Sequence, residues 1–216
     1  MNEAVRVQGE KITETATHIY FVTGPYSQWY RSDFKQALFK DSDPLQFNCA
    51  EQYMMAGKAI TCEDYEILEK VMGVQYEGGD WRRVPEAQKK LGRQIVNFNK
   101  AAWDAVARPV VFRGNFAKFT QNSKLYEYIM FGGDKYLVEG ARYDEVWGVK
   151  LAWDDPLILD PKNWRGTNWL GQCLMATRNA MRYCHQNGIQ YTHLDIWDAA
   201  LVQSFFDQIP PCAEDN

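Results

Sequence analysis

The stretch FNCAEQYMMAGKA, residues 47–59, predicts the first helix of the fold. Apolar residues recur in it at helical spacing, and Asn48 is a residue type that often begins a helix. Two charged residues interrupt the apolar face, Glu51 near its start and Lys58 near its end. They lie seven positions apart, so both project from one side of the helix, about 10 Å apart along its axis. Both side chains could therefore converge on a ligand lying over Tyr53 and the two methionines.

Each charge also has an ordinary explanation. In a helix begun by Asn48, Glu51 falls at the third position, where its carboxylate can complete a capping box. Lys58 can lay its methylene chain along the apolar face and keep its ammonium group in water. Spacing alone leaves these alternatives open.

The pattern along the rest of the chain predicts the α+β class, a mainly helical single domain with a small β-sheet. Helical periodicity is expected at 62–72, 85–96, 99–107, 109–120, 122–131 and 166–184. Extended structure is expected at 18–24, on either side of the turn residues 41–44, and in two short pieces within 137–151. We expect a flexible N-terminal segment at 1–16, the domain at 17–185, and a peripheral C-terminal extension at 186–216.

Composition narrows the function classes. The chain of 216 residues carries a net charge of −4, which argues against broad binding to a nucleic-acid backbone but leaves room for a local basic pocket. Five cysteines without a CxxC pair and three scattered histidines predict neither a disulfide framework nor a zinc site. Because the chain shows no apolar leader and no run of 18 apolar residues, we expect a cytoplasmic protein, with the nucleus also open.

Two further stretches carry candidate site residues. In YDEVWG, residues 143–148, Asp144 can form an Asx turn, or it can hold sugar hydroxyls beside the Trp147 ring. In NWRGTNWLGQCLM, residues 163–175, Arg165 comes just before a helix whose N-cap is Thr167 or Asn168. Such a helix start is either an ordinary cap or a phosphate site made of free N–H groups and the arginine.

Taken in order, these stretches resemble the NADAR family, also called YbiA-like, in which N-glycosidases and ADP-ribose-processing proteins are found. The resemblance runs from about Phe21 to Arg182 through FVTGPYSQWY, AEQYMMAGKA, LGRQI, NKAAWDAV, NFAKFTQN, GGDKYLVEGARYDEVWGVKL and WRGTNWLGQCLM. Two positions depart from the family pattern: Gln28 stands where Asn is usual, and Gln52 where His is usual. The second departure implies that position 52 does not supply a general base.

The resemblance implies a set of functional residues. Motif positions are matched by Glu51, Lys58, Trp103, Asp144, Trp147 and Asn168. The implied catalytic residues are Lys58, Glu51 and Asp144, and candidate substrate-binding residues are Tyr53, Arg93, Trp103, Lys118, Trp147, Gly148, Arg165 and Asn168. No cofactor and no metal are implied.

The resemblance also implies the reaction, hydrolysis of the bond between ribose or ADP-ribose and an exocyclic base amine. We expect removal of ADP-ribose from guanine through a Schiff base on Lys58. Burial on the apolar face should lower the pKa of this lysine. The alternatives are direct displacement by water activated by Glu51 or Asp144, action on early riboflavin-biosynthesis intermediates, and a non-catalytic ADP-ribose reader. The expected partner is ADP-ribose, as a small molecule or on DNA or RNA, bound by a monomer that does not contact membranes.

Overall fold

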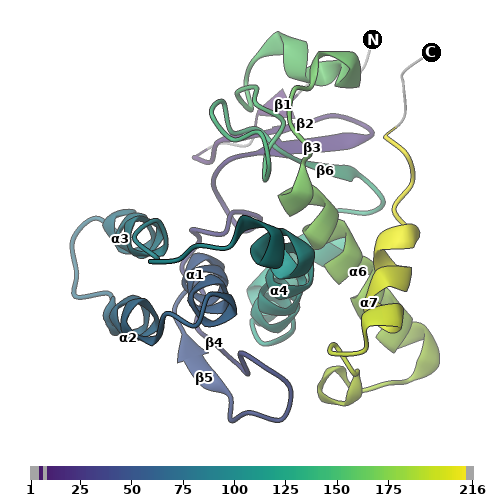
Figure 1. Cartoon of the computed structure of the whole chain (residues 1–216). Helices are drawn as coiled ribbons and strands as arrows, with labels where there is room; N and C mark the ends of the chain where they lie inside the picture. Colours follow the sequence, from purple (N-terminus) through teal and green to yellow (C-terminus); the bar gives the residue numbers. More distant parts are fainter. Residues whose placement is uncertain (1–4, 7–8, 213–216) are drawn as a thin grey trace. The chain divides into compact units, whose positions relative to one another are not determined.

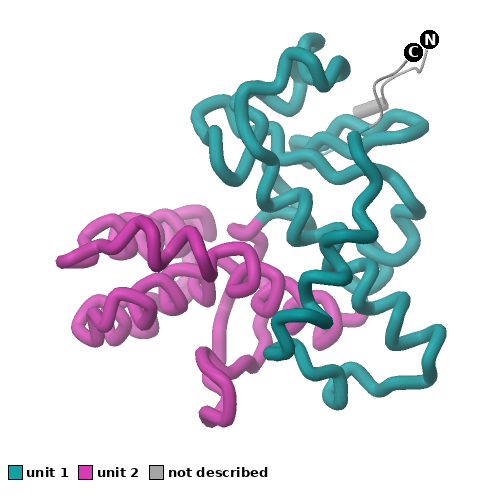
Figure 2. The backbone as a smooth tube through the Cα atoms, turned by 45° about the vertical axis from the view of Figure 1, so that its right-hand side comes forward, with its two compact units in different colours: residues 1–27, 124–216 teal, residues 28–123 magenta. Residues whose placement is uncertain are grey.

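The structure, a computed structural model, describes residues 5–6 and 9–212 (Figure 1). The chain forms two compact units (Figure 2). Unit 1 consists of Met1–Ser27 and Lys124–Asn216, and unit 2 is the continuous segment Gln28–Ser123 between them. Within the described ranges, no helix combines the length and the apolar character needed to cross a membrane.

Unit 1 is built on a four-stranded sheet in the order β1-β2-β3-β6. Its strands are β1 (Val5–Arg6), β2 (Ile12–Glu14), β3 (His18–Phe21) and β6 (Tyr136–Glu139). The first three strands pair antiparallel, and β3 pairs with β6 in parallel, with His18 opposite Tyr136. All four side chains of β3 are buried, as expected for a central strand covered on both faces.

Helix α6 (Trp169–Asn187) packs along β6, and α7 (Ala199–Asp207) packs along α6. Gly171 permits the first contact, because a Cβ atom at this position would lie 2.1 Å from the carbonyl oxygen of Leu137 in β6. On α7, Phe205 is completely buried and its ring contacts that of Tyr183 on α6. The remaining helical elements are α5 (Ser123–Phe131), η1 (Pro156–Leu159), η2 (Pro161–Asn163) and η3 (Tyr191–His193).

Unit 2 is a helical bundle organised around α1 (Ala50–Thr61). This helix contacts each of the other three, α2 (Tyr65–Gly73), α3 (Arg83–Gly92) and α4 (Lys100–Thr120). The hairpin of β4 (Phe34–Gln36) and β5 (Leu45–Phe47) closes the bundle through aromatic contacts. The ring of Tyr53 on α1 lies 6.2 Å from that of Phe34 and 5.0 Å from that of Phe47, centroid to centroid.

The α+β class, the mainly helical content and the hairpin around residues 41–44 are confirmed. The expected break near Pro109 is wrong, because α4 continues through it. Proline removes one helix hydrogen bond, but Val110, Val111 and Phe112 are buried directly after it, and their packing keeps the segment helical. Of 137–151, only β6 is extended.

Both ends of the chain are more ordered than the sequence predicts. Residues 12–14, inside the segment expected to be flexible, form β2 and pair with β3. The segment after 186 is not peripheral, because it contains α7 with buried Val202, Phe205 and Phe206. The rest of residues 1–8 and the last four residues lie outside the described residues.

Candidate functional site

The start of α1 places a carboxyl group in the interior. The N-cap of this helix is Cys49, so Glu51 is its second residue and Gln52 its third. Gln52 reaches back to the residue before the N-cap, since its Oε1 accepts the N–H of Asn48 at 2.9 Å. The capping-box interpretation of Glu51 is therefore wrong. Glu51 is only 4% exposed, and carboxyl groups are seldom buried to this extent.

An amide pair holds this end of α1. The backbone N–H of Glu51 donates to the carbonyl oxygen of Gln28 at 3.0 Å. The side chain of Gln28 is fixed in turn, because its Oε1 accepts a hydrogen bond from Nδ2 of Asn115 on α4 at 3.0 Å. Asn115 is completely buried, and the same nitrogen also donates to the carbonyl of Val111 at 2.9 Å. The pair thus links α4 to the first turn of α1.

Lys58 lies near the other end of α1, with its amine only partly in water. Its Nζ donates to the carbonyl oxygen of Gly92 at 2.9 Å and lies 4.2 Å from the centroid of the Phe98 ring. Gly92 ends α3, and a Cβ atom there would lie 2.2 Å from Sδ of Met55 on α1. Only glycine lets α3 approach α1 closely enough for this contact.

Burial lowers the pKa of the Lys58 amine below its usual range, as the sequence predicts. Smaller effects follow from its neighbours: the Cys62 thiol raises this pKa, the Arg93 guanidinium lowers it, and the Glu51 carboxylate raises it. These electrostatic contributions show that Arg93 and Glu51 both act on the amine within unit 2. A fraction of neutral lysine, the nucleophilic form, is favoured here.

The other predicted residues of unit 2, apart from Arg93, are more deeply buried than Lys58. Tyr53 is a core residue whose hydroxyl donates to the carbonyl of Ala37 at 2.8 Å. Trp103 is buried on α4, whereas Arg93 is exposed at the end of α3. Lys118 on α4 is completely buried, and desolvation lowers its pKa to about 7 although the nearby Cys49 raises it. A phosphate contact by Lys118 would need a charge that its surroundings disfavour.

In unit 1, Asp144 forms the Asx turn that the sequence offered as one alternative. Its Oδ1 accepts the backbone N–H groups of Val146 at 3.1 Å and Trp147 at 2.8 Å. These bonds fix the turn that carries the half-buried Trp147, whose ring meets that of Trp169 edge to face at 5.7 Å. Gly148 follows in the same turn, and its carbonyl oxygen accepts the N–H of Asn168.

The start of α6 is held by protein groups. The N–H groups of Asn168, Trp169 and Leu170 donate to the carbonyl oxygens of residues 148, 146 and 147 at 3.1 Å each. Because these three N–H groups are already satisfied, the structure favours the ordinary cap over the phosphate site, the two alternatives that the sequence left open. The Arg165 side chain is exposed. The buried side chain of Asn168 bridges to β6, because it accepts the backbone N–H of Glu139 and donates to the carbonyl oxygen of Leu137.

The predicted residues thus fall into two groups, one in each unit. Unit 2 holds the carboxyl group of Glu51 and the amine of Lys58, with Arg93 close enough to affect that amine. Unit 1 holds Asp144, Trp147, Gly148, Arg165 and Asn168. Among the described residues, no three His, Cys, Asp or Glu side chains gather as metal ligands would.

Sequence reasoning did not single out Asn115, Gly92 or Phe98. One signal was available for Asn115: it lies four residues after Val111 on a helix face that is otherwise apolar. A polar residue in such a position is satisfied by a specific partner. No local signal identified Gly92, because its importance arises from a neighbouring helix.

Comparisons with known proteins identify a domain family, relatives and a solved structure to which this chain is similar. Residues 19–182 match the NADAR domain. The chain is 34% identical over 153 residues to an N-glycosidase of Acanthamoeba polyphaga mimivirus. The aligned part covers 71% of this chain and 85% of the relative. It is 29% identical over 182 residues to protein irg-1 of Caenorhabditis elegans, covering 80% and 82% of the two chains. The NMR structure of Escherichia coli YbiA has the same fold, with a TM-score of 0.60, 21% identity, and coverage of 88% of this chain and 98% of that one.

Proposed function

The chain belongs to the NADAR family, and from this premise we propose that it is an N-glycosidase that removes ADP-ribose from the exocyclic amine of guanine. As a hydrolase of N-glycosyl bonds it resembles the mimivirus relative, which is named for such an activity. The observation that carries the proposal is the pairing on one helix of a partly buried amine, Lys58, with a buried carboxyl group, Glu51.

The chemistry needs both groups. In a glycosylamine, the lone pair of the exocyclic nitrogen can open the sugar ring, giving a C1′ iminium while the ring oxygen takes a proton from Glu51. The neutral amine of Lys58 then adds to C1′. Transfer of a proton to the base nitrogen allows the bond from C1′ to that nitrogen to break, so guanine leaves and a Schiff base on Lys58 remains.

Hydrolysis completes the cycle. Glu51 takes a proton from water as the oxygen adds to C1′, and collapse of the adduct returns Lys58 and releases ADP-ribose. This sequence requires an amine that is neutral in part at working pH, and the lowered pKa of Lys58 supports that requirement. It also requires a carboxyl group withdrawn from bulk water, which the burial of Glu51 supports.

The choice of ADP-ribose as the sugar rests on charge. Its diphosphate needs basic groups beside the reacting carbon, and Arg93 is near enough to influence the Lys58 amine. In unit 1, Asp144 and Trp147 stay predicted site residues, and the Asx turn fixes both of them. Arg165, whose side chain is exposed, likewise stays a predicted substrate-binding residue of unit 1.

Substrate assays with the full chain test the proposal. Purified protein is incubated with ADP-ribosylated guanine and, separately, with the ribosylated riboflavin-biosynthesis intermediates, and the released base is identified by mass. We expect release of guanine together with ADP-ribose. Release only from the riboflavin intermediates would overturn the substrate, and ADP-ribose binding without turnover of either compound would make the protein a reader.

A further inference from the structure

A thiol, an imidazole and a hydroxyl group are aligned in unit 1, whereas Lys58 and Glu51 belong to helix α1 of unit 2. Sγ of Cys212 lies 3.7 Å from Nε2 of His18. On the other side of the ring, Nδ1 of His18 lies 2.8 Å from Oγ1 of Thr17. A nucleophile next to a base, with the base oriented by a third group, is the arrangement that activates nucleophilic side chains in enzymes.

The fold fixes the base and brings the thiol to it. His18 is the first residue of the buried strand β3 and is 2% exposed. Its ring is stacked on that of Tyr20, with centroids 5.5 Å apart and planes 8° from parallel, and is flanked by Tyr136 at 5.6 Å. The segment after α7 runs back towards the sheet (Figure 1), and Cys212 in this segment lies next to the His18 ring. The imidazole therefore cannot turn away from the thiol without unpacking its aromatic neighbours.

We propose that Cys212 is a thiol modification site, activated by His18, that reacts with small disulfides such as oxidised glutathione. The exposure of this thiol supports its accessibility to a reagent. Cys212 is partly exposed, whereas Cys49, Cys173 and Cys184 are buried.

The reaction is a thiol–disulfide exchange that balances without a further oxidant. The imidazole takes the thiol proton at Nε2, and the Cys212 thiolate attacks one sulfur of the disulfide. The sulfur–sulfur bond of the disulfide breaks as the new bond to Cys212 forms. The leaving thiolate recovers the proton from the imidazolium and departs as glutathione. Restoring Cys212 requires a second thiol, so the modification is reversible.

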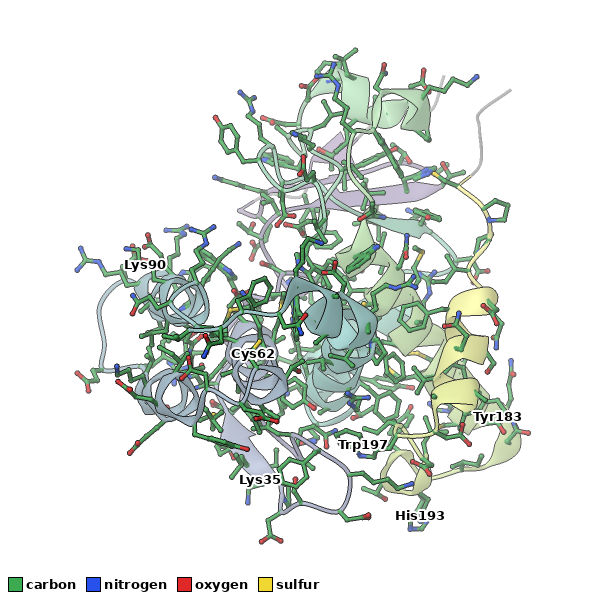
Figure 3. The ribbon with its side chains drawn as sticks, viewed as in Figure 1. Lys35, Cys62, Lys90, Tyr183, His193 and Trp197 are labelled. Atoms are coloured by element: carbon green, nitrogen blue, oxygen red, sulfur yellow. The ribbon has the colours of Figure 1, made fainter. Side chains whose placement is uncertain are left out.

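Cys62 provides a comparison within the same chain, with the Lys58 amine rather than a histidine as its basic neighbour. It is also partly exposed, lies at the C-terminal end of α1 (Figure 3) and has no histidine among its described contacts. At pH 7 an ordinary thiol is about 3% ionised, so a base that brings ionisation to near half should raise the rate about tenfold. Rates are measured by incubating the full chain with oxidised glutathione, quenching with acid and counting the modified peptides by mass.

We expect Cys212 to react about tenfold faster than Cys62. In His18→Phe, which keeps an aromatic ring but removes both nitrogens, the Cys212 rate should fall to the Cys62 rate. Equal rates in the unaltered chain, or an unchanged Cys212 rate in His18→Phe, would overturn the proposal.

The His18→Phe chain counts as folded when the three buried cysteines stay unreactive. If they react, Thr17→Val replaces it, because this substitution removes only the hydroxyl that orients the ring. A Cys212 rate in Thr17→Val equal to that of the unaltered chain then overturns the proposal, and a severalfold slower rate supports it. None of these measurements depends on the glycosidase reaction.

Discussion

The amine of Lys58 donates to the carbonyl oxygen of Gly92, with Nζ and O 2.9 Å apart. This bond joins α1 to the last residue of α3 and holds the amine against the Phe98 ring. A carbonyl acceptor, unlike a carboxylate, does not strongly favour the charged ammonium form. The contact can therefore position the nitrogen without preventing it from becoming neutral.

Lys58→Ala should abolish turnover and leave the fold intact, because alanine keeps a good helix former but removes the nucleophile. Borohydride added during turnover should trap the sugar on Lys58 in the unaltered chain, as detected by peptide mass. Lys70→Ala, which removes an exposed lysine of α2, is the control and should retain full activity. A near-normal rate in Lys58→Ala with no trapped adduct would favour direct displacement by water.

Glu51→Gln should lower the single-turnover rate by roughly 10²–10⁴ while substrate affinity is kept, because the amide has the same shape but does not transfer protons. Glu66→Gln is the matched control, since Glu66 is also in the first turn of its helix but is exposed. A Glu51 variant that melts earlier but reacts at the normal rate would assign this residue a purely structural role.

The rate should rise with pH and level off, because only neutral Lys58 attacks. The midpoint reports the pKa of the folded protein, and burial places it below the ordinary lysine value of 10.5. Since Arg93 lowers this pKa, Arg93→Gln should move the midpoint to higher pH. Single-turnover rates across a pH series would show both effects, and a profile that is flat up to pH 10 would argue against lysine as the nucleophile.

Lys118 should make stability depend on pH. Desolvation lowers its pKa in the folded chain from 10.5 to about 7, so between these values the unfolded chain binds more protons. The free energy of unfolding should therefore rise as pH increases through this window. Urea unfolding of Lys118→Met should show a flatter dependence, while Lys124→Met, at an exposed position, should follow the unaltered chain. Identical slopes for Lys118→Met and the unaltered chain would show that Lys118 does not titrate as described.

Asn115→Leu should reduce the free energy of unfolding by about 1–3 kcal/mol, because Oε1 of Gln28 loses its buried donor. A second substitution, Gln28→Met, removes the stranded acceptor, and the double variant should recover part of the loss. Urea unfolding of the four chains in this cycle gives the coupling between the two side chains. Additive losses would mean that the 3.0 Å contact contributes nothing to stability.

The elements that could be predicted from sequence are those whose pattern is local. Helix α1, the hairpin and the burial of the Lys58 amine follow from apolar spacing and turn residues within a few positions of each other. The continuous α4 could not be read in this way, since tertiary packing of Val110 and Val111 overrides the signal of Pro109.

The candidate site was harder to predict for the same reason. Glu51 and Lys58 stand out because charge interrupts an apolar face. The N–H groups of Asn168, Trp169 and Leu170 are taken by carbonyl groups about twenty residues earlier in the chain. Whether helix N–H groups are available to a ligand is decided by such distant backbone, and no local motif records it.

The burial of Phe205 against α6 means that the shared family segment, which ends at residue 182, is not a self-sufficient piece of this protein. A chain trimmed to residues 17–185 would lose α7 and would also leave β3 without its neighbour β2. One helix face and one strand edge, both normally covered, would then be open to other molecules. Light scattering should find such a fragment more strongly self-associated than the full chain.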